Sequence, residues 1–88
     1  MSHGRGWWDK PVRIERGNTG RPFGVGNNNR AAEILLHEWP TAPGPKHLAA
    51  RKAVLKAMER ALDAKRQAAA RKAFLEAAKE AGIAFDDE

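Results

Sequence analysis

Cysteine and tyrosine are absent from this 88-residue chain, and Ser2 is its only serine. Without thiols the chain forms neither disulfides nor thiolate metal sites, which fits a reducing compartment. No apolar run approaches the roughly 20 residues of a membrane-spanning helix. The first ten residues also lack the apolar segment of a signal peptide. We therefore expect a cytoplasmic protein without a membrane segment.

Residues that usually carry catalysis or hold a metal are scarce as well. No G-x-S-x-G motif is present. The stretch 37–40 reads H-E-W-P and is not an H-E-x-x-H zinc motif, because threonine stands at position 41. A zinc site needs three or four converging ligands, and the histidines are few and scattered. We predict a protein that is not an enzyme and that binds no metal or cofactor.

The net charge of +5 comes from two basic blocks. Residues 1–30 hold six Lys/Arg against two acids, and residues 46–66 hold seven against two. Such blocks attract phosphates through a long-range, salt-sensitive term, although most are ordinary solvated surface. If they bind nucleic acid, the expected phosphate contacts are Arg13, Arg16, Arg21, Arg30, Lys52, Lys56 and Arg60.

Alternating apolar residues predict a β-hairpin near the N-terminus. Trp8, Val12 and Ile14 share one face of an extended strand. A glycine-rich turn follows, and a second strand alternates again, so we expect strands at roughly 10–16 and 21–26. The same glycines are also open to a second interpretation, in which the turn and the next helix N-terminus hold an anion.

Three helices are expected after the hairpin. The first is predicted at 30–39, where an apolar stripe recurs with helical spacing. The stretch 46–81 has no glycine or proline, yet one helix of that length would span about 54 Å, too long for so small a domain. Its apolar phase also breaks, so we expect two helices separated near 63–66, with Gly82 and Ile83 forming the final cap.

The fold class is therefore α+β: an N-terminal two-stranded β-hairpin followed by three α-helices in a single small domain. The domain is expected at 7–83, between a disordered leader at 1–6 and an acidic tail at 84–88. The core stripe expected on the first helix is Ala32, Leu35, Leu36 and Trp39. The stripe expected on the second helix is Ala50, Val54, Leu55, Met58, Ala61 and Leu62.

Four residues are candidates for interaction: Trp7, Glu38, His47 and Arg51. His47 lies on the apolar side of the second helix, where a histidine is usually packed and bonded to a backbone carbonyl. Trp7 points away from Trp8, which is expected in the core together with Trp39. Trp7 is then either an exposed interface residue or a cover for the next element.

Arg51 is a charge placed among apolar neighbours of the second helix. It must extend to water or find a carboxylate, and Glu33 and Glu38 on the first helix are the expected partners. Glu33 is also expected to pair with His37 one turn later. In the alternative interpretation, the apolar arc around Arg51 is an exposed contact surface and Arg51 is its anchor.

Several segments together resemble the domain-of-unknown-function family 982, small uncharacterised proteins of rhizobia and related alphaproteobacteria. The segments are Pro11-Val12-Arg13-Ile14, the block Leu35-Leu36-His37-Glu38-Trp39-Pro40 followed by Gly44 and His47, and Ala70-Arg71-Lys72-Ala73-Phe74. The resemblance covers roughly residues 8–84. It implies the same fold and a cytoplasmic location, and it supplies no activity.

Three functions are consistent with these patterns. The first is a small non-enzymatic interaction module that binds a protein partner and associates with itself. The alternative is a basic accessory protein that binds nucleic acid through the hairpin arginines and the lysines of the second helix. The third is a ligand pocket around His47, Arg51 and Glu38.

Overall fold

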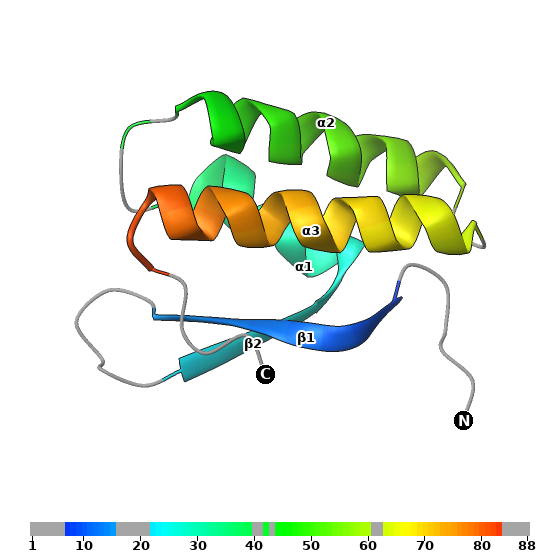
Figure 1. Cartoon of the computed structure of the whole chain (residues 1–88), viewed down its shortest axis with the longest axis horizontal. Coiled ribbons are helices and arrows are strands. Elements are labelled where there is room, and N and C mark those ends of the chain that lie inside the picture. Colours follow the sequence, from blue (N-terminus) through cyan, green and yellow to red (C-terminus); the bar gives the residue numbers. More distant parts are fainter. Residues whose placement is uncertain (1–6, 16–21, 40–41, 43, 61–62, 84–88) are drawn as a thin grey trace.

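The computed structural model describes residues 7–15, 22–39, 42, 44–60 and 63–83. The elements follow in the order β1 (Trp7–Glu15), β2 (Pro22–Asn27), α1 (Asn28–His37), α2 (Pro45–Glu59) and α3 (Ala64–Glu80) (Figure 1). This confirms the predicted α+β class, a two-stranded hairpin followed by three helices. The expected leader at 1–6 and acidic tail at 84–88 lie outside the described residues.

The hairpin has one apolar face and one polar face. β1 and β2 pair antiparallel, with Val12 opposite Val25. The side chains of Trp8, Val12, Ile14 and Val25 are buried, as period-two alternation predicts, whereas Arg13 is exposed. Because a two-stranded sheet alone is barely stable in water, its apolar face must be covered by helices.

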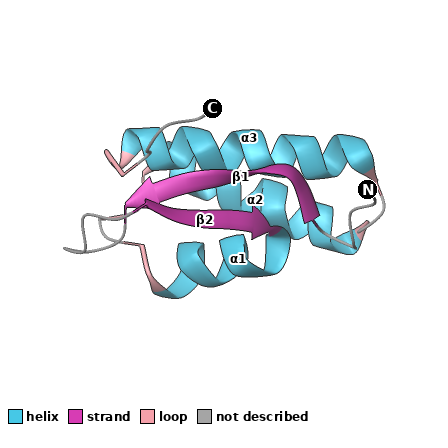
Figure 2. Cartoon of the chain, turned by 90° about the horizontal axis from the view of Figure 1, so that it is seen from below, coloured by secondary structure: helices cyan, strands magenta, loops and turns pink. Residues whose placement is uncertain are grey.

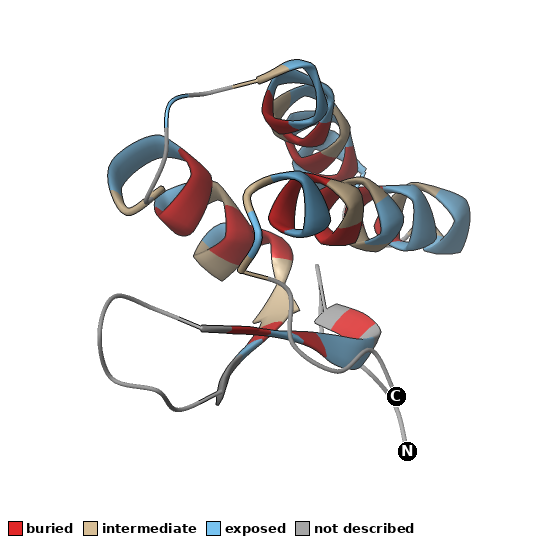
Figure 3. Ribbon diagram, turned by 60° about the vertical axis from the view of Figure 1, so that its left-hand side comes forward, coloured by how far each residue is buried: buried red, intermediate tan, exposed pale blue. Residues whose placement is uncertain are grey.

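The three helices cover that face in two tiers. α3 packs along β1 and α1 packs along β2 (Figure 2). α2 packs against α3 and α1 on their far side, away from the sheet (Figure 3). One side of α2 is therefore in contact with the rest of the fold, and its other side faces solvent.

Side-chain caps fix where α1 and α3 begin. The backbone N–H of Arg30 donates to Oδ1 of Asn27 at 2.8 Å, so α1 starts two residues before the predicted position 30 and ends at 37. Asp63 caps α3 in the same way and accepts from the backbone N–H groups of Lys65 and Arg66. Each cap satisfies donors that the first helical turn leaves unpaired.

The predicted separation of the last two helices is correct, but its place is not. α2 ends at Glu59 and α3 begins at Ala64, so the break lies at 60–63 and not at the expected 63–66. The helix starts at Ala64 because Asp63 caps its first turn. The predicted final cap is confirmed. Gly82 has a φ of 74°, and the N–H groups of Gly82 and Ile83 donate to carbonyls of the last turn of α3 at 3.1 and 2.9 Å.

Phe74 of α3 is fully buried at the centre of the core. Its ring centroid lies 5.7 Å from that of Trp8 and 6.0 Å from that of Trp39. Trp8 is buried, and Trp39 packs against the core with part of its surface exposed. The predicted core position is therefore confirmed for Trp8, whereas Trp39 packs against the core without being buried in it.

The predicted apolar stripes are partly wrong. On α1 the buried face includes Ala31 and Ile34, whereas Leu36 is 52% exposed. On α2, Leu55 and Met58 are exposed by 53% and 40% although both were expected in the core. The physical reason is the position of α2 in the outer tier, where α1 and α3 cover only part of its apolar arc.

A chain of buried polar side chains crosses the core and was not predicted. Trp8 Nε1–H donates to Asn28 Oδ1 at 2.9 Å. The Asn28 amide donates to Gln67 Oε1. The Gln67 amide in turn donates to the carbonyls of Ala57 and Arg60, both at 3.1 Å. The hairpin and all three helices are thereby joined through hydrogen bonds as well as apolar contact.

Candidate interaction surface

The most distinctive surface of the molecule is an apolar face on α1 and α2. Within the described ranges, the large hydrophobic side chains that are exposed are Leu36, Leu48, Leu55 and Met58. The first is on α1 and the other three are on α2. We refer to these four residues together with Arg51 as the α1/α2 face. Grouped exposed apolar residues of this kind usually mark a contact site.

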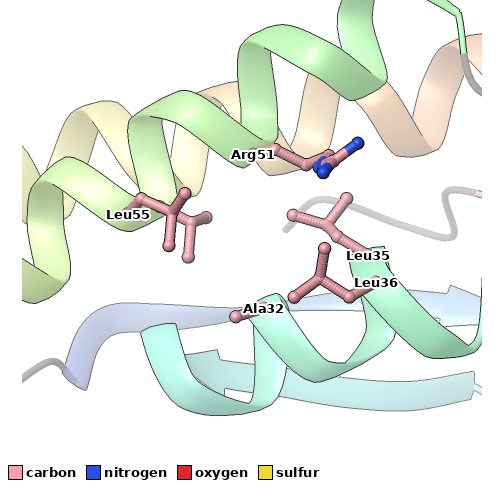
Figure 4. Close-up of a pocket in the computed structure, with 6 residues that line it drawn as sticks. Ala32, Leu35, Leu36, Arg51 and Leu55 are labelled. Atoms are coloured by element: carbon pink, nitrogen blue, oxygen red, sulfur yellow. The ribbon is translucent and has the colours of Figure 1, made fainter.

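A shallow groove runs along this face between the two helices. Its lining residues are Ala32, Leu35, Leu36, Arg51, Val54 and Leu55. Figure 4 shows Leu36 and Leu55 approaching the groove from opposite helices, with Arg51 above Leu35 at one end. Apart from Arg51 the lining is apolar, so the groove offers contact area and little hydrogen bonding.

The helical period explains why α2 carries this face. At about 100° per residue, His47, Ala50, Val54 and Ala57 fall on one arc, and all four are buried. The adjoining arc of α2 holds Leu48, Arg51, Leu55 and Met58. An apolar region half a helix wide cannot be covered by the two neighbouring helices alone, so its outer half remains exposed.

Arg51 has no carboxylate within ion-pair distance among the described residues. The predicted pair with Glu33 or Glu38 is wrong, because Arg30 binds both: its Nη1 lies 2.6 Å from Glu33 Oε1 and 3.3 Å from Glu38 Oε2. The expected pair of Glu33 with His37 is likewise replaced by Arg30. Arg51 is thus a half-buried charge beside leucines.

Arg30 is correspondingly committed to its two carboxylates. The hydrogen bond with Glu33 is the main reason that the pKa of Arg30 is raised above its ordinary value, and the charge of Glu38 adds to it. An anion at the N-terminus of α1 would have to compete with Glu33 and Glu38 for this guanidinium. Arg30 is therefore less available to an anion bound at the glycine-rich stretch. Arg21, the other arginine near that stretch, lies outside the described residues.

His47 is a packed residue, as the sequence predicts. Its side chain is 3% exposed, and its Nε2 lies 2.9 Å from the carbonyl oxygen of Leu35. Because a carbonyl only accepts, Nε2–H is the donor. The imidazole ring also meets the edge of Trp39 at a centroid distance of 5.0 Å. His47 thereby ties α2 to the last turn of α1.

The structure gives the candidate interaction residues different surroundings. His47 is bonded to Leu35, Glu38 contacts Arg30, and Arg51 lines the groove. Trp7 pairs with Asn27 through its backbone, and its side chain lies outside the described set. Nothing among the described residues forms a group of three side chains suited to hold a metal ion.

The basic residues are divided between opposite sides of the molecule. Lys52, Lys56 and Arg60 are exposed on α2. Arg13 is exposed on the face of the hairpin that points away from the helices, since its neighbours Val12 and Ile14 are buried. The predicted contacts Arg16 and Arg21 lie outside the described residues. Of the hairpin arginines, only Arg13 is among the described residues, and it does not share a surface with the three cations of α2.

Membrane insertion through a helix finds no support: none of the described helices has both the length and the apolar composition to span a bilayer.

Comparison with known proteins gives a family and a fold. The family described as "Protein of unknown function (DUF982)" matches residues 10–85. Among solved structures, the NMR structure of the Agrobacterium tumefaciens protein Atu1219 is similar, with a TM-score of 0.73 and 25% sequence identity. The match covers 100% of this chain and 89% of that one. No curated protein matches the chain.

Proposed function

Since the chain belongs to the protein family of unknown function DUF982, we propose its function from its own surface: it is a small interaction module that binds protein through the α1/α2 face. The observation that carries this proposal is the grouping of exposed large hydrophobics. All four within the described residues lie on this one face. No covalent step is assigned to any residue.

The chemistry of the face suits a protein surface better than a small ligand. The groove is small, and Arg51 is its one polar lining residue. Ligand pockets usually enclose most of a small molecule and present several fixed polar groups. Protein interfaces instead combine an apolar centre with a few anchors, among which arginine is enriched. A carboxylate on the partner would also give Arg51 the charge partner that the described residues do not supply.

Site-specific photo-crosslinking tests this function. A photoreactive phenylalanine analogue at position 55 should give discrete protein adducts in cells, because Leu55 is 53% exposed at the middle of the face. The matched control is the same analogue at position 69, an exposed alanine on α3. Adducts that form at both positions alike, or at neither, would contradict the proposal.

A second candidate function is nucleic-acid binding through α2. Its supporting observation is that Lys52, Lys56 and Arg60 are exposed, and none has a carboxylate within ion-pair distance in the described part of the chain. Affinity for random-sequence DNA and RNA should then fall steeply between about 50 and 200 mM salt. The slope of the logarithm of affinity against the logarithm of salt concentration should become shallower by about 2 when Lys52 and Lys56 are both changed to alanine. Changing Lys65 and Lys72 to alanine should leave this slope unchanged.

A further inference from the structure

We infer that the partner at the α1/α2 face is a second copy of this chain, packed with its α2 antiparallel to the first; the inference rests on the proposed function. The outward stripe of α2 has the spacing of a helix-pairing seam. Leu48 and Leu55 are seven residues apart, as are Arg51 and Met58, and the two pairs are offset by three. This alternation of three and four residues places side chains along one line that a second helix can cover.

The flanking charges determine the direction of the second helix. Lys52 and Glu59 border the same edge of the stripe, seven residues apart, and both are exposed. In a parallel pair, seam residues of the same number face each other, so Arg51 would face Arg51, while the Lys52 and Glu59 side chains of the two copies would lie on opposite sides of the seam. In an antiparallel pair, Lys52 faces Glu59 of the second copy, and symmetry repeats the contact.

That register also gives Arg51 a partner. Glu59 of the second copy lies opposite Lys52, which is next to Arg51 in the sequence. The side chains of Lys52 and Arg51 can therefore both reach the Glu59 carboxylate. Glu59 is available for this contact, because its side chain is 73% exposed and its ion pair with Arg66 is long, at 3.9 Å. The two-fold axis then passes between positions 55 and 56, where Leu55 meets Leu55 of the second copy.

The contact is small, and we expect a weak dimer. α2 is about 22 Å long, and with position 52 opposite position 59 the two copies of α2 overlap only over residues 52–59, about 12 Å, so the helix pair stands at the low end of protein interfaces. Leu36 on the neighbouring helix adds apolar area beside the stripe. The charge pairs remain near solvent, where they influence orientation more than affinity.

Disulfide trapping tests the orientation, and the absence of cysteine makes each introduced thiol the sole one in the chain. Leu55→Cys should form a linked dimer at least tenfold faster than Ala69→Cys, which measures random collision. Leu48→Cys should link no faster than Ala69→Cys, because the two copies of position 48 are about 22 Å apart along the pair. Equal, rapid linking by Leu48→Cys and Leu55→Cys would indicate a parallel pair and overturn the inference.

Charge reversal tests the register by sedimentation equilibrium. Lys52→Glu and Glu59→Lys should each weaken the dimer by about 2- to 10-fold, because each brings like charges together at both contacts between positions 52 and 59. An equimolar mixture of the two variants should recover much of the lost affinity, since both contacts between positions 52 and 59 are again between opposite charges. Lys72→Glu on α3 is the matched control and should change nothing.

The outcomes separate this inference from the proposed function. If Leu55→Cys links no faster than Ala69→Cys while the photo-crosslinker at position 55 captures a different protein, the face binds protein and the inference of a second copy is wrong. If position 55 captures nothing and the dimer does not form, both are wrong.

Discussion

The indole Nε1–H of Trp8 donates a 2.9 Å hydrogen bond to Oδ1 of Asn28 and so joins the first strand to the first turn of α1. Both side chains are buried, and the Asn28 amide continues the network to Gln67 of α3. One asparagine therefore connects the hairpin to two helices. Because a buried polar group left without a partner is costly, this residue should matter to stability more than its small size indicates.

Asn28→Ala should lower the free energy of unfolding by about 2–3 kcal/mol, because it leaves the indole N–H of Trp8 and the side-chain oxygen Oε1 of Gln67 without their partner. Urea unfolding monitored by tryptophan fluorescence measures the change. Asn29→Ala is the control, since Asn29 is the exposed neighbour on the same helix turn. Equal urea midpoints for the two variants would show that the network contributes no net stability.

The two sides of α2 should respond differently to the same substitution. Val54 is 1% exposed and Leu55 is 53% exposed. Val54→Ala should destabilise the monomer by about 2 kcal/mol through the cavity it leaves, and Leu55→Ala by well under 1 kcal/mol. Thermal unfolding at low protein concentration, where self-association is negligible, compares them. A larger loss for Leu55→Ala would mean that α2 is rotated relative to the structure.

Gly82→Ala should lower the free energy of unfolding by about 1–2 kcal/mol, because Gly82 has a φ of 74° that alanine adopts at a cost. The cost comes from the backbone alone, since an added Cβ meets nothing within 4 Å. Gly24→Ala is the matched control: its Cβ makes an ordinary 3.7 Å contact with Pro11, and its φ is not positive. Circular dichroism melting curves compare the loss of stability in the two variants. An equal loss in both would mean that α3 does not end in this cap.

The secondary structure was largely predictable because its signals are local. The alternation around Val12 and the Gly82 cap each depend on a few consecutive residues. The sequence predicts the break after α2 at 63–66, whereas in the structure the break ends at Asp63, which caps α3. Its capping role becomes visible only when its side chain is seen accepting from the first turn of α3.

The candidate surface was less predictable because it depends on tertiary position. The sequence shows that α2 has a wide apolar arc, and nothing in it shows that α2 lies in the outer tier, with Leu55 and Met58 uncovered. The predicted partner of Arg51 is wrong for a different, local reason. Arg30 stands three residues before Glu33, a spacing that favours a pair on one helix, and Arg30 takes the carboxylates expected to pair with Arg51.

His47 provides the clearest distinction between folding and binding, because it neighbours the face without being part of it. His47→Ala removes the donor to the Leu35 carbonyl and the ring that packs on Trp39, so it should cost about 2–4 kcal/mol of stability. Leu48→Ala, one residue along, changes a side chain that is 52% exposed. It should leave stability nearly unchanged and weaken partner binding.

Measuring urea midpoints and photo-crosslinking yields for both variants separates the two roles. At a temperature where it is folded, His47→Ala should retain the adducts formed at position 55, and Leu48→Ala should lower their yield. A His47→Ala variant with wild-type stability and no adducts would reverse this assignment. It would then place His47 in a binding pocket together with Arg51, the interpretation that the hydrogen bond to Leu35 argues against.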